Sequence, residues 1–166
     1  MSDNGAMSPN DSSDLSYDPA GGPAGTPVGG LVSRLESIVG APYVSVDEES
    51  IERLSFDAID PDRLMARAGD VESRVAAVVR PATTDEVAGV VRLANELGLP
   101  VIPYGGGTGV MGAVIPLSGG IAVDLRRMNR VLDVQVEDRL AVVQPAVVLA
   151  DLDAAARVQG LQMAHD

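Results

Sequence analysis

The fold is decided by residues 75–109, which read VAAVVRPATTDEVAGVVRLANELGLPVIPYGGGTG. The apolar run from Val75 to Val79 lies too close to Pro81 for a helix, so it predicts a strand that is buried on both faces. Thr83 and Glu86 form a capping box, which predicts that a helix begins here. The segment therefore starts with a strand that leads directly into a helix.

The predicted helix has one apolar face and ends at Gly98; the face consists of Val87, Val90, Val91, Ala94 and Leu97. The β-branched pair Val101-Ile102 predicts a second short strand. A strand, a helix and a second strand form a right-handed parallel crossover. Residues 105–109, here called the glycine loop, then leave the carboxyl end of the second strand, which is where α/β sheets bind ligands.

The glycine loop has the sequence GGGTG, with four glycines around Thr108. A backbone without Cβ atoms can turn tightly and point successive N–H groups into one concavity, as a phosphate or pyrophosphate requires. These residues alone fit either an anion cradle or a mobile surface loop. The position of the loop at the end of a strand favours the cradle.

Two better-known nucleotide motifs do not explain this loop. Gly107, Gly109 and Gly112 match the G-x-G-x-x-G spacing, and Asp124 lies at a suitable distance beyond them. A Rossmann fold needs a helix to begin at these glycines, and Pro116 leaves no space for one. A Walker loop is excluded because no Gly-Lys-Ser/Thr follows. We therefore expect irregular backbone after the glycine loop.

The flanking segments complete the predicted organisation. Residues 1–30 are rich in Ser, Asp, Pro and Gly and predict a disordered tail. Residues 31–74 predict an N-terminal helical lead-in with two short helices, residues 31–39 and 46–54, the second capped by Asp47 or Ser45. Downstream we expect a strand over residues 120–125, a hairpin formed by 130–136 and 139–143, and a helix from Val148 to Ala156 that is stopped by Gly160.

The composition of the chain limits the kinds of molecule that we expect it to bind. The formal net charge is −12, which argues against nucleic acid or an anionic membrane surface as the main partner. A bound pyrophosphate would therefore be held by backbone dipoles more than by a basic patch. Cysteine is absent, which excludes disulfides and thiolate metal sites and suits a cytoplasmic location. No apolar run approaches the ~18 residues of a membrane-spanning helix, and residues 1–30 do not form a secretory signal.

Several short blocks occur in one order along the chain: Val78-Val79-Arg80-Pro81, Thr84-Asp85-Glu86-Val87, Pro103-Tyr104-Gly105-Gly106-Gly107-Thr108-Gly109, Met128-Asn129-Arg130, Val143-Gln144-Pro145 and Leu149-Ala150-Asp151-Leu152. Together they resemble the FAD-binding PCMH-type domain of the FAD-linked oxidases, a group that contains D-lactate dehydrogenases, the glycolate oxidase flavin subunit and alkylglycerone-phosphate synthase. The resemblance covers residues 75–166. It implies an α+β fold with a small parallel βαβ subdomain and the start of a larger antiparallel subdomain, incomplete at Asp166.

The resemblance also implies a cofactor site. In similar proteins the glycine loop binds the FAD pyrophosphate with main-chain N–H groups, which assigns cofactor binding to Pro103, Tyr104, Gly105, Gly106, Gly107, Thr108 and Gly109. Thr108 stands where some relatives attach the flavin through a histidine, so noncovalent FAD is expected. From the residues alone, Pro103 fits an ordinary strand-end proline equally well, and Tyr104 fits an ordinary packing role.

The reaction implied by the resemblance is oxidation of a 2-hydroxy acid, of the D-lactate or glycolate type, by hydride transfer to the flavin. We name no catalytic residue and no metal ligand, because the residues that similar enzymes use for the substrate would lie beyond Asp166, and we expect the chain to be inactive alone. His165, the single histidine, is followed by Asp166 in a way that resembles alkylglycerone-phosphate synthase. That enzyme type is one alternative, and a non-enzymatic binding module is another.

Overall fold

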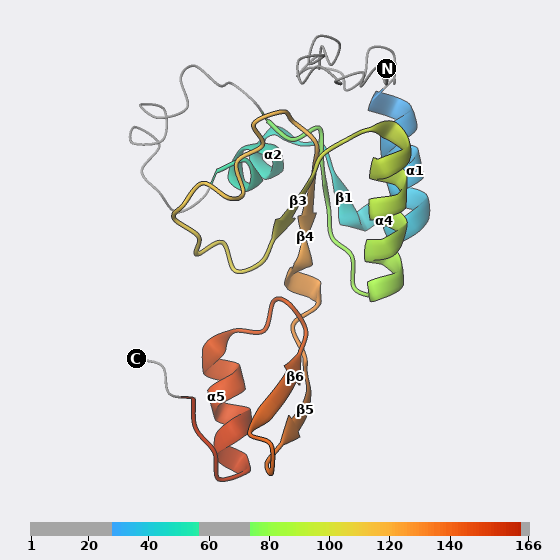
Figure 1. Cartoon of the computed structure of the whole chain (residues 1–166). Coiled ribbons are helices and arrows are strands. Elements are labelled where there is room, and N and C mark those ends of the chain that lie inside the picture. Colours follow the sequence, from blue (N-terminus) through green and yellow to red (C-terminus); the bar gives the residue numbers. More distant parts are fainter. Residues whose placement is uncertain (1–27, 57–73, 164–166) are drawn as a thin grey trace, which may run out of the picture.

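The structure is a computed structural model that describes residues 28–56 and 74–163. These residues form two parts (Figure 1). The first is a four-stranded sheet with helices on both faces, and the second is a two-stranded sheet with one helix. The predicted disordered tail, residues 1–30, lies outside the described residues up to residue 27, but residues 28–30 belong to the first helix, α1 (Val28–Val39), so the prediction is wrong for these three residues. His165 also lies outside the described residues.

The four-stranded sheet has the order β1-β2-β4-β3. Strands β2 (Ala77–Val79) and β3 (Val101–Tyr104) both run parallel to β4 (Ile121–Asp124), which lies between them. The predicted parallel strand-helix-strand unit is therefore confirmed. Strand β1 (Val44–Ser45) adds an antiparallel edge next to β2, which joins the helical lead-in to the same sheet.

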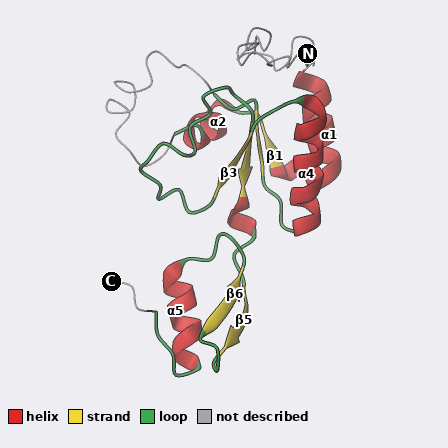
Figure 2. Ribbon diagram, viewed as in Figure 1, coloured by secondary structure: helices red, strands yellow, loops and turns green. Residues whose placement is uncertain are grey.

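The helices cover the sheet on both sides (Figure 2). Helices α1 (Val28–Val39) and α4 (Thr84–Leu97) pack on one face, and α2 (Glu48–Leu54) packs on the other. The predicted capping box is present: the Thr83 Oγ1 accepts a hydrogen bond from the Glu86 amide at 3.2 Å, and the Glu86 carboxylate accepts one from the Ala82 amide at 2.7 Å. Asp47, rather than Ser45, caps α2 by accepting from the Ser50 amide at 2.9 Å.

Side-chain alternation along the strands separates two hydrophobic cores. One core lies under α1 and α4 and contains Leu31, Leu35, Val39, Ala77, Val79, Val90, Leu93, Ala94, Leu99, Ile121 and Val123. The other lies under α2 and contains Leu54, Val75, Val78, Ile102 and Ala122. The sheet is thus buried on both faces, as the continuous apolar run at β2 predicted.

The second part follows β4 through the short 3-10 helix η2 (Leu125–Arg127). Strands β5 (Val131–Gln135) and β6 (Leu140–Val143) form the predicted antiparallel hairpin, and α5 (Leu149–Val158) packs beside it. Several large apolar side chains of this part are exposed, namely Leu132, Val136, Leu140, Val142, Val143, Val148, Leu149 and Val158. Within the described residues, this part buries much less of its apolar surface than the four-stranded sheet does.

Candidate functional site

The glycine loop leaves β3 at the carboxyl edge of the parallel strands, where it was predicted to lie. β3 is the outer strand of the sheet, and Pro103 is exposed within it. An edge strand accommodates proline because one side of its backbone has no strand partner. No helix begins at the glycines, and residues 105–120 form bends and turns. The irregular backbone expected in place of a Rossmann helix is confirmed.

The main-chain N–H groups of the glycine loop have no main-chain partner in the described part of the chain. Within residues 28–56 and 74–163, no main-chain carbonyl accepts a hydrogen bond from the amides of residues 105–109. These residues are exposed or half-buried, and Gly107 adopts a left-handed φ of 71°. Unpaired amides on a backbone of this kind are the donors that an anionic group needs. The loop therefore fits a pyrophosphate.

The space around the glycines is open except on two sides. A Cβ built on Gly109 would meet no atom within 4 Å, and one on Gly106 would first meet the Thr108 methyl group at 3.9 Å. A Cβ on Gly105 would lie 3.8 Å from the carbonyl oxygen of Pro145. Because Pro145 follows β6, the second part of the chain borders the beginning of the glycine loop.

Tyr104 forms the other side. A Cβ built on Gly107 would lie 2.9 Å from the Tyr104 Cζ and closer still to its hydroxyl oxygen. The phenol ring therefore lies directly against the Gly107 backbone.

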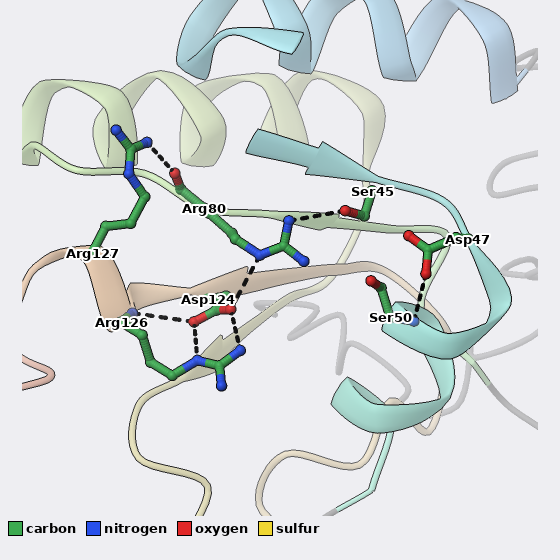
Figure 3. Close-up of polar contacts among 7 residues, drawn as sticks. All are labelled: Ser45, Asp47, Ser50, Arg80, Asp124, Arg126 and Arg127. Carbon is green, nitrogen blue, oxygen red and sulfur yellow. Dashed lines mark hydrogen bonds and ion pairs between the residues drawn. The ribbon is translucent and has the colours of Figure 1, made fainter. Parts of the chain in front are cut away.

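Arginine side chains gather around Asp124 at the carboxyl end of β4 (Figure 3). The Asp124 carboxylate accepts hydrogen bonds from Arg126 Nε at 2.8 Å, Arg126 Nη2 at 2.6 Å and the Arg126 amide at 3.1 Å. Arg80 Nε lies 3.5 Å from the same carboxylate, and Arg80 Nη1 donates to the Ser45 hydroxyl at 2.9 Å. Sequence reasoning missed this cluster, although Arg80 directly follows β2 and η2 directly follows β4 at the edge that carries the loop.

The charged groups around Asp124 shift one another's pKa values toward the ionised forms. Burial raises the pKa of Asp124, but the hydrogen bonds from the Arg126 side chain and amide and the charges of Arg126 and Arg80 outweigh it, so the pKa lies below its ordinary value. The hydrogen bond to Asp124 in turn raises the pKa of Arg126. Asp124 is therefore a carboxylate, and it holds two guanidinium groups at the carboxyl edge of the sheet.

Two hollows in the described structure lie away from this edge. One, of about 270 Å³, lies between α1 and α4 and is lined by Arg34, Ser37, Ile38, Gly89, Arg92, Leu93 and Glu96. The other, of about 140 Å³, lies between the hairpin and α5. The glycine loop presents its amides at an open edge.

None of the described helices combines the length and the apolar character needed to cross a membrane.

A parallel strand-helix-strand unit with a glycine loop at its carboxyl edge, followed by an antiparallel hairpin, is an arrangement typical of nucleotide-cofactor-binding domains. The family model described as "FAD binding domain" matches residues 75–166. The chain belongs to this family, the PCMH-type FAD-binding domains of the FAD-linked oxidases, and the cofactor of the family is FAD.

Relatives and solved structures agree with this assignment. The chain is 47% identical over 83 residues to an uncharacterized FAD-linked oxidoreductase of Mycobacterium tuberculosis, covering 50% of this chain and 18% of the relative. It is 38% identical over 133 residues to a D-lactate dehydrogenase of Anaerostipes hadrus, covering 72% of this chain and 27% of the relative. A solved alkyldihydroxyacetonephosphate synthase superposes with a TM-score of 0.72 at 26% identity, over 85% of this chain and 27% of that one.

The chain therefore spans 27% or less of the length of these relatives. The predicted α+β fold with a parallel subdomain and the start of an antiparallel one is confirmed, and so is FAD as the cofactor. The roles of Pro103, Tyr104 and residues 105–109 stay predictions, as does the boundary at residue 74.

Proposed function

We propose that the chain is the part of an FAD-dependent oxidoreductase that binds the pyrophosphate of noncovalent FAD through the main-chain amides of the glycine loop. The observation that carries this proposal is the set of unpaired amides at the carboxyl end of β3. The net charge of −12 makes a general attraction for anions an insufficient explanation. The local dipoles of the loop amides supply the attraction instead.

Each assigned residue has a separate task in this proposal. Gly105, Gly106 and Gly109 leave room for a close approach of phosphate oxygens to the main chain. Gly107 makes the turn, and Thr108 adds a hydroxyl donor from an exposed position. Pro103 fixes the φ with which the chain enters the loop. Tyr104 supports the loop from within.

The whole protein is proposed to oxidise a 2-hydroxy acid such as D-lactate or glycolate. Bound FAD would supply the hydride acceptor for that reaction. The identity of 38% to a D-lactate dehydrogenase over 72% of this chain supports this substrate class. The structural likeness to an alkyldihydroxyacetonephosphate synthase supports the alternative of a non-redox transferase. The cytoplasmic location and the inactivity of residues 1–166 alone stay predictions.

Flavin retention tests the cofactor site. We expect the purified protein to retain FAD, seen as visible absorbance released by denaturation, and Gly106→Val to lose it. The matched control is Gly30→Val in α1: a Cβ at Gly30 meets no described atom within 4 Å, and one at Gly106 meets only the Thr108 methyl group at 3.9 Å. Full retention by Gly106→Val would mean that the loop is only scaffolding.

Reduction of an artificial electron-accepting dye separates the two reactions. A hydroxy-acid dehydrogenase passes electrons from D-lactate or glycolate to the dye through its flavin, so dye bleaching that depends on the acid is expected. A transferase of the alkyldihydroxyacetonephosphate synthase type gives no net bleaching with either acid. The assay needs the whole protein, because residues 1–166 alone are expected to be inactive; a flavin-loaded whole protein that is inert toward both acids would contradict the proposed substrate class.

A further inference from the structure

Asp124 is a buried carboxylate, and a group of this kind needs hydrogen-bonding partners. It ends the central strand β4, and its side chain is only 2% exposed. Of the residues that the structure describes, it is the one charged residue that is buried. A buried carboxylate without hydrogen bonds is strongly unfavourable, so the bidentate contact with Arg126 is fixed by the fold and is not an optional surface pair.

The fixed guanidinium of Arg126 lies over the ring of Tyr104. The distance from the Arg126 Cζ to the ring centroid is 5.7 Å, within the range of a cation–π contact. The two residues meet because Tyr104 and Asp124 are direct partners in the β3–β4 ladder. The last pair of the parallel strands thus carries both the carboxylate and the ring.

The ring of Tyr104 lies against Gly107, whose φ of 71° belongs to the left-handed region. A chain of contacts therefore runs from Asp124 through Arg126 and Tyr104 to the turn of the glycine loop. The three links are a charge-assisted hydrogen-bonded pair, a cation–π contact and a packing contact. The loop has no main-chain hydrogen bonds of its own among the described residues, and this chain of contacts connects it to the end of β4.

We propose that Arg126 is a positioning residue for the glycine loop: clamped by Asp124, it holds Tyr104 against Gly107 and so sets the loop amides in their binding arrangement before the cofactor arrives. The inference rests on the proposed role of this loop in FAD binding. If the loop is already ordered before FAD binds, binding does not carry the entropy cost of ordering it. Arg126 acts here through Tyr104 and not through contact with a phosphate.

Backbone dynamics of the FAD-free protein test this inference independently of cofactor binding. The probe is the ¹⁵N order parameter of the residue 105–109 amides. We expect values of about 0.8 in the natural protein and below about 0.6 in Arg126→Gln, Arg126→Lys and Tyr104→Leu, the range of flexible backbone. Arg92→Gln is the charge-matched control on α4, and its loop should behave as in the natural protein.

Tyr104→Leu leaves the Asp124–Arg126 pair intact, so it tests the same clamp even if the Arg126 variants fold poorly. Unchanged loop order parameters in Tyr104→Leu, or in folded Arg126→Gln, would overturn the inference.

FAD titration of the same variants separates positioning from direct contact. Lysine keeps the charge but cannot form the bidentate pair with Asp124 or present a planar face to Tyr104. Positioning therefore predicts that Arg126→Lys and Arg126→Gln lose affinity equally, by up to about tenfold, the effect of ordering one or two groups. Natural affinity in Arg126→Lys with a loss in Arg126→Gln would show a charge contact and overturn the inference. If the natural protein bound no FAD, the proposed function would be wrong. The order parameters of residues 105–109 would still test whether Arg126 positions the loop.

Discussion

Gly105 of the glycine loop lies against Pro145, with 3.8 Å between the Pro145 carbonyl oxygen and the point that a Cβ on Gly105 would occupy. These residues belong to different parts of the molecule, one directly after β3 and the other after β6. The glycine loop is therefore bounded by the sheet that carries it and by the turn that precedes α5. A cofactor bound at this loop would be within reach of both parts.

Gly107→Ala should destabilise the protein even without FAD. The left-handed φ of 71° disfavours any residue with a Cβ, and the new methyl group would overlap the Tyr104 ring. We expect the free energy of unfolding to fall by about 1–3 kcal/mol, as for strained backbone positions. Urea denaturation measures it. An unchanged midpoint would show that the loop adjusts freely and that Tyr104 does not constrain it.

Gly109→Ala should behave in the opposite way. The added Cβ meets no atom within 4 Å and the φ of Gly109 is not in the left-handed region, so stability should change by less than about 0.5 kcal/mol. FAD affinity should still fall, because the methyl group occupies space that the ligand needs. Isothermal titration with FAD measures the affinity. If affinity survived, Gly109 would lie outside the ligand contact.

Asp124→Asn should lower stability in a pH-dependent manner. The pKa of Asp124 in the folded protein lies below its ordinary value of 3.8, so the carboxylate contributes stability above that pH. This contribution is lost as the pH falls through 3.8 toward the folded-state pKa. At neutral pH we expect Asn to cost about 1.5–3 kcal/mol, the worth of hydrogen bonds to a charged group.

The difference between Asp124→Asn and the natural protein should then shrink on acidification. Urea denaturation at neutral and acidic pH gives the two differences. Asp133→Asn is the control, since Asp133 is exposed in β5 and its substitution removes the same charge. A gap that stays constant with pH would contradict a role for the ionised Asp124.

Arg127 and Tyr43 should be energetically coupled. The Arg127 Cζ lies 3.4 Å from the Tyr43 ring centroid, and Arg127 Nη1 donates to the Arg80 carbonyl oxygen at 2.7 Å. A double-mutant cycle with Arg127→Gln and Tyr43→Leu should give a coupling of about 0.5–2 kcal/mol, the range of cation–π contacts. Additive effects within error would show that the stacking contributes nothing to attaching β1.

The sequence predicted most of the elements because their signals are local. The capping box at Thr83, the glycine that ends α4 and the apolar run of β2 are each made of one residue or of residues a few positions apart. Strand β1 was missed because two residues are too short to show any periodicity. Its pairing depends instead on the tertiary contacts of Arg80 with Ser45 and with the Tyr43 carbonyl oxygen.

The glycine loop was predicted from its composition and from its place after a strand, whereas its support was not. The contact between Tyr104 and Gly107 depends on how an irregular turn folds back, which no periodic pattern encodes. The pairing of Asp124 with Arg126 is close in sequence, but its burial depends on β4 lying between β2 and β3. The net charge of the whole chain gave no sign of the arginines around Asp124, because a sum over all residues does not show where a few of them lie together.

The central place of β4 has a consequence for how the chain is made. β4 is the last of the four strands to leave the ribosome, yet it is the only one of them that pairs with both β2 and β3. Until residues 121–124 emerge, β3 has no neighbour and β2 has only the two-residue β1. A nascent chain stalled before Ile121 would expose open strand edges to other polypeptides, which is the kind of surface through which incomplete chains aggregate.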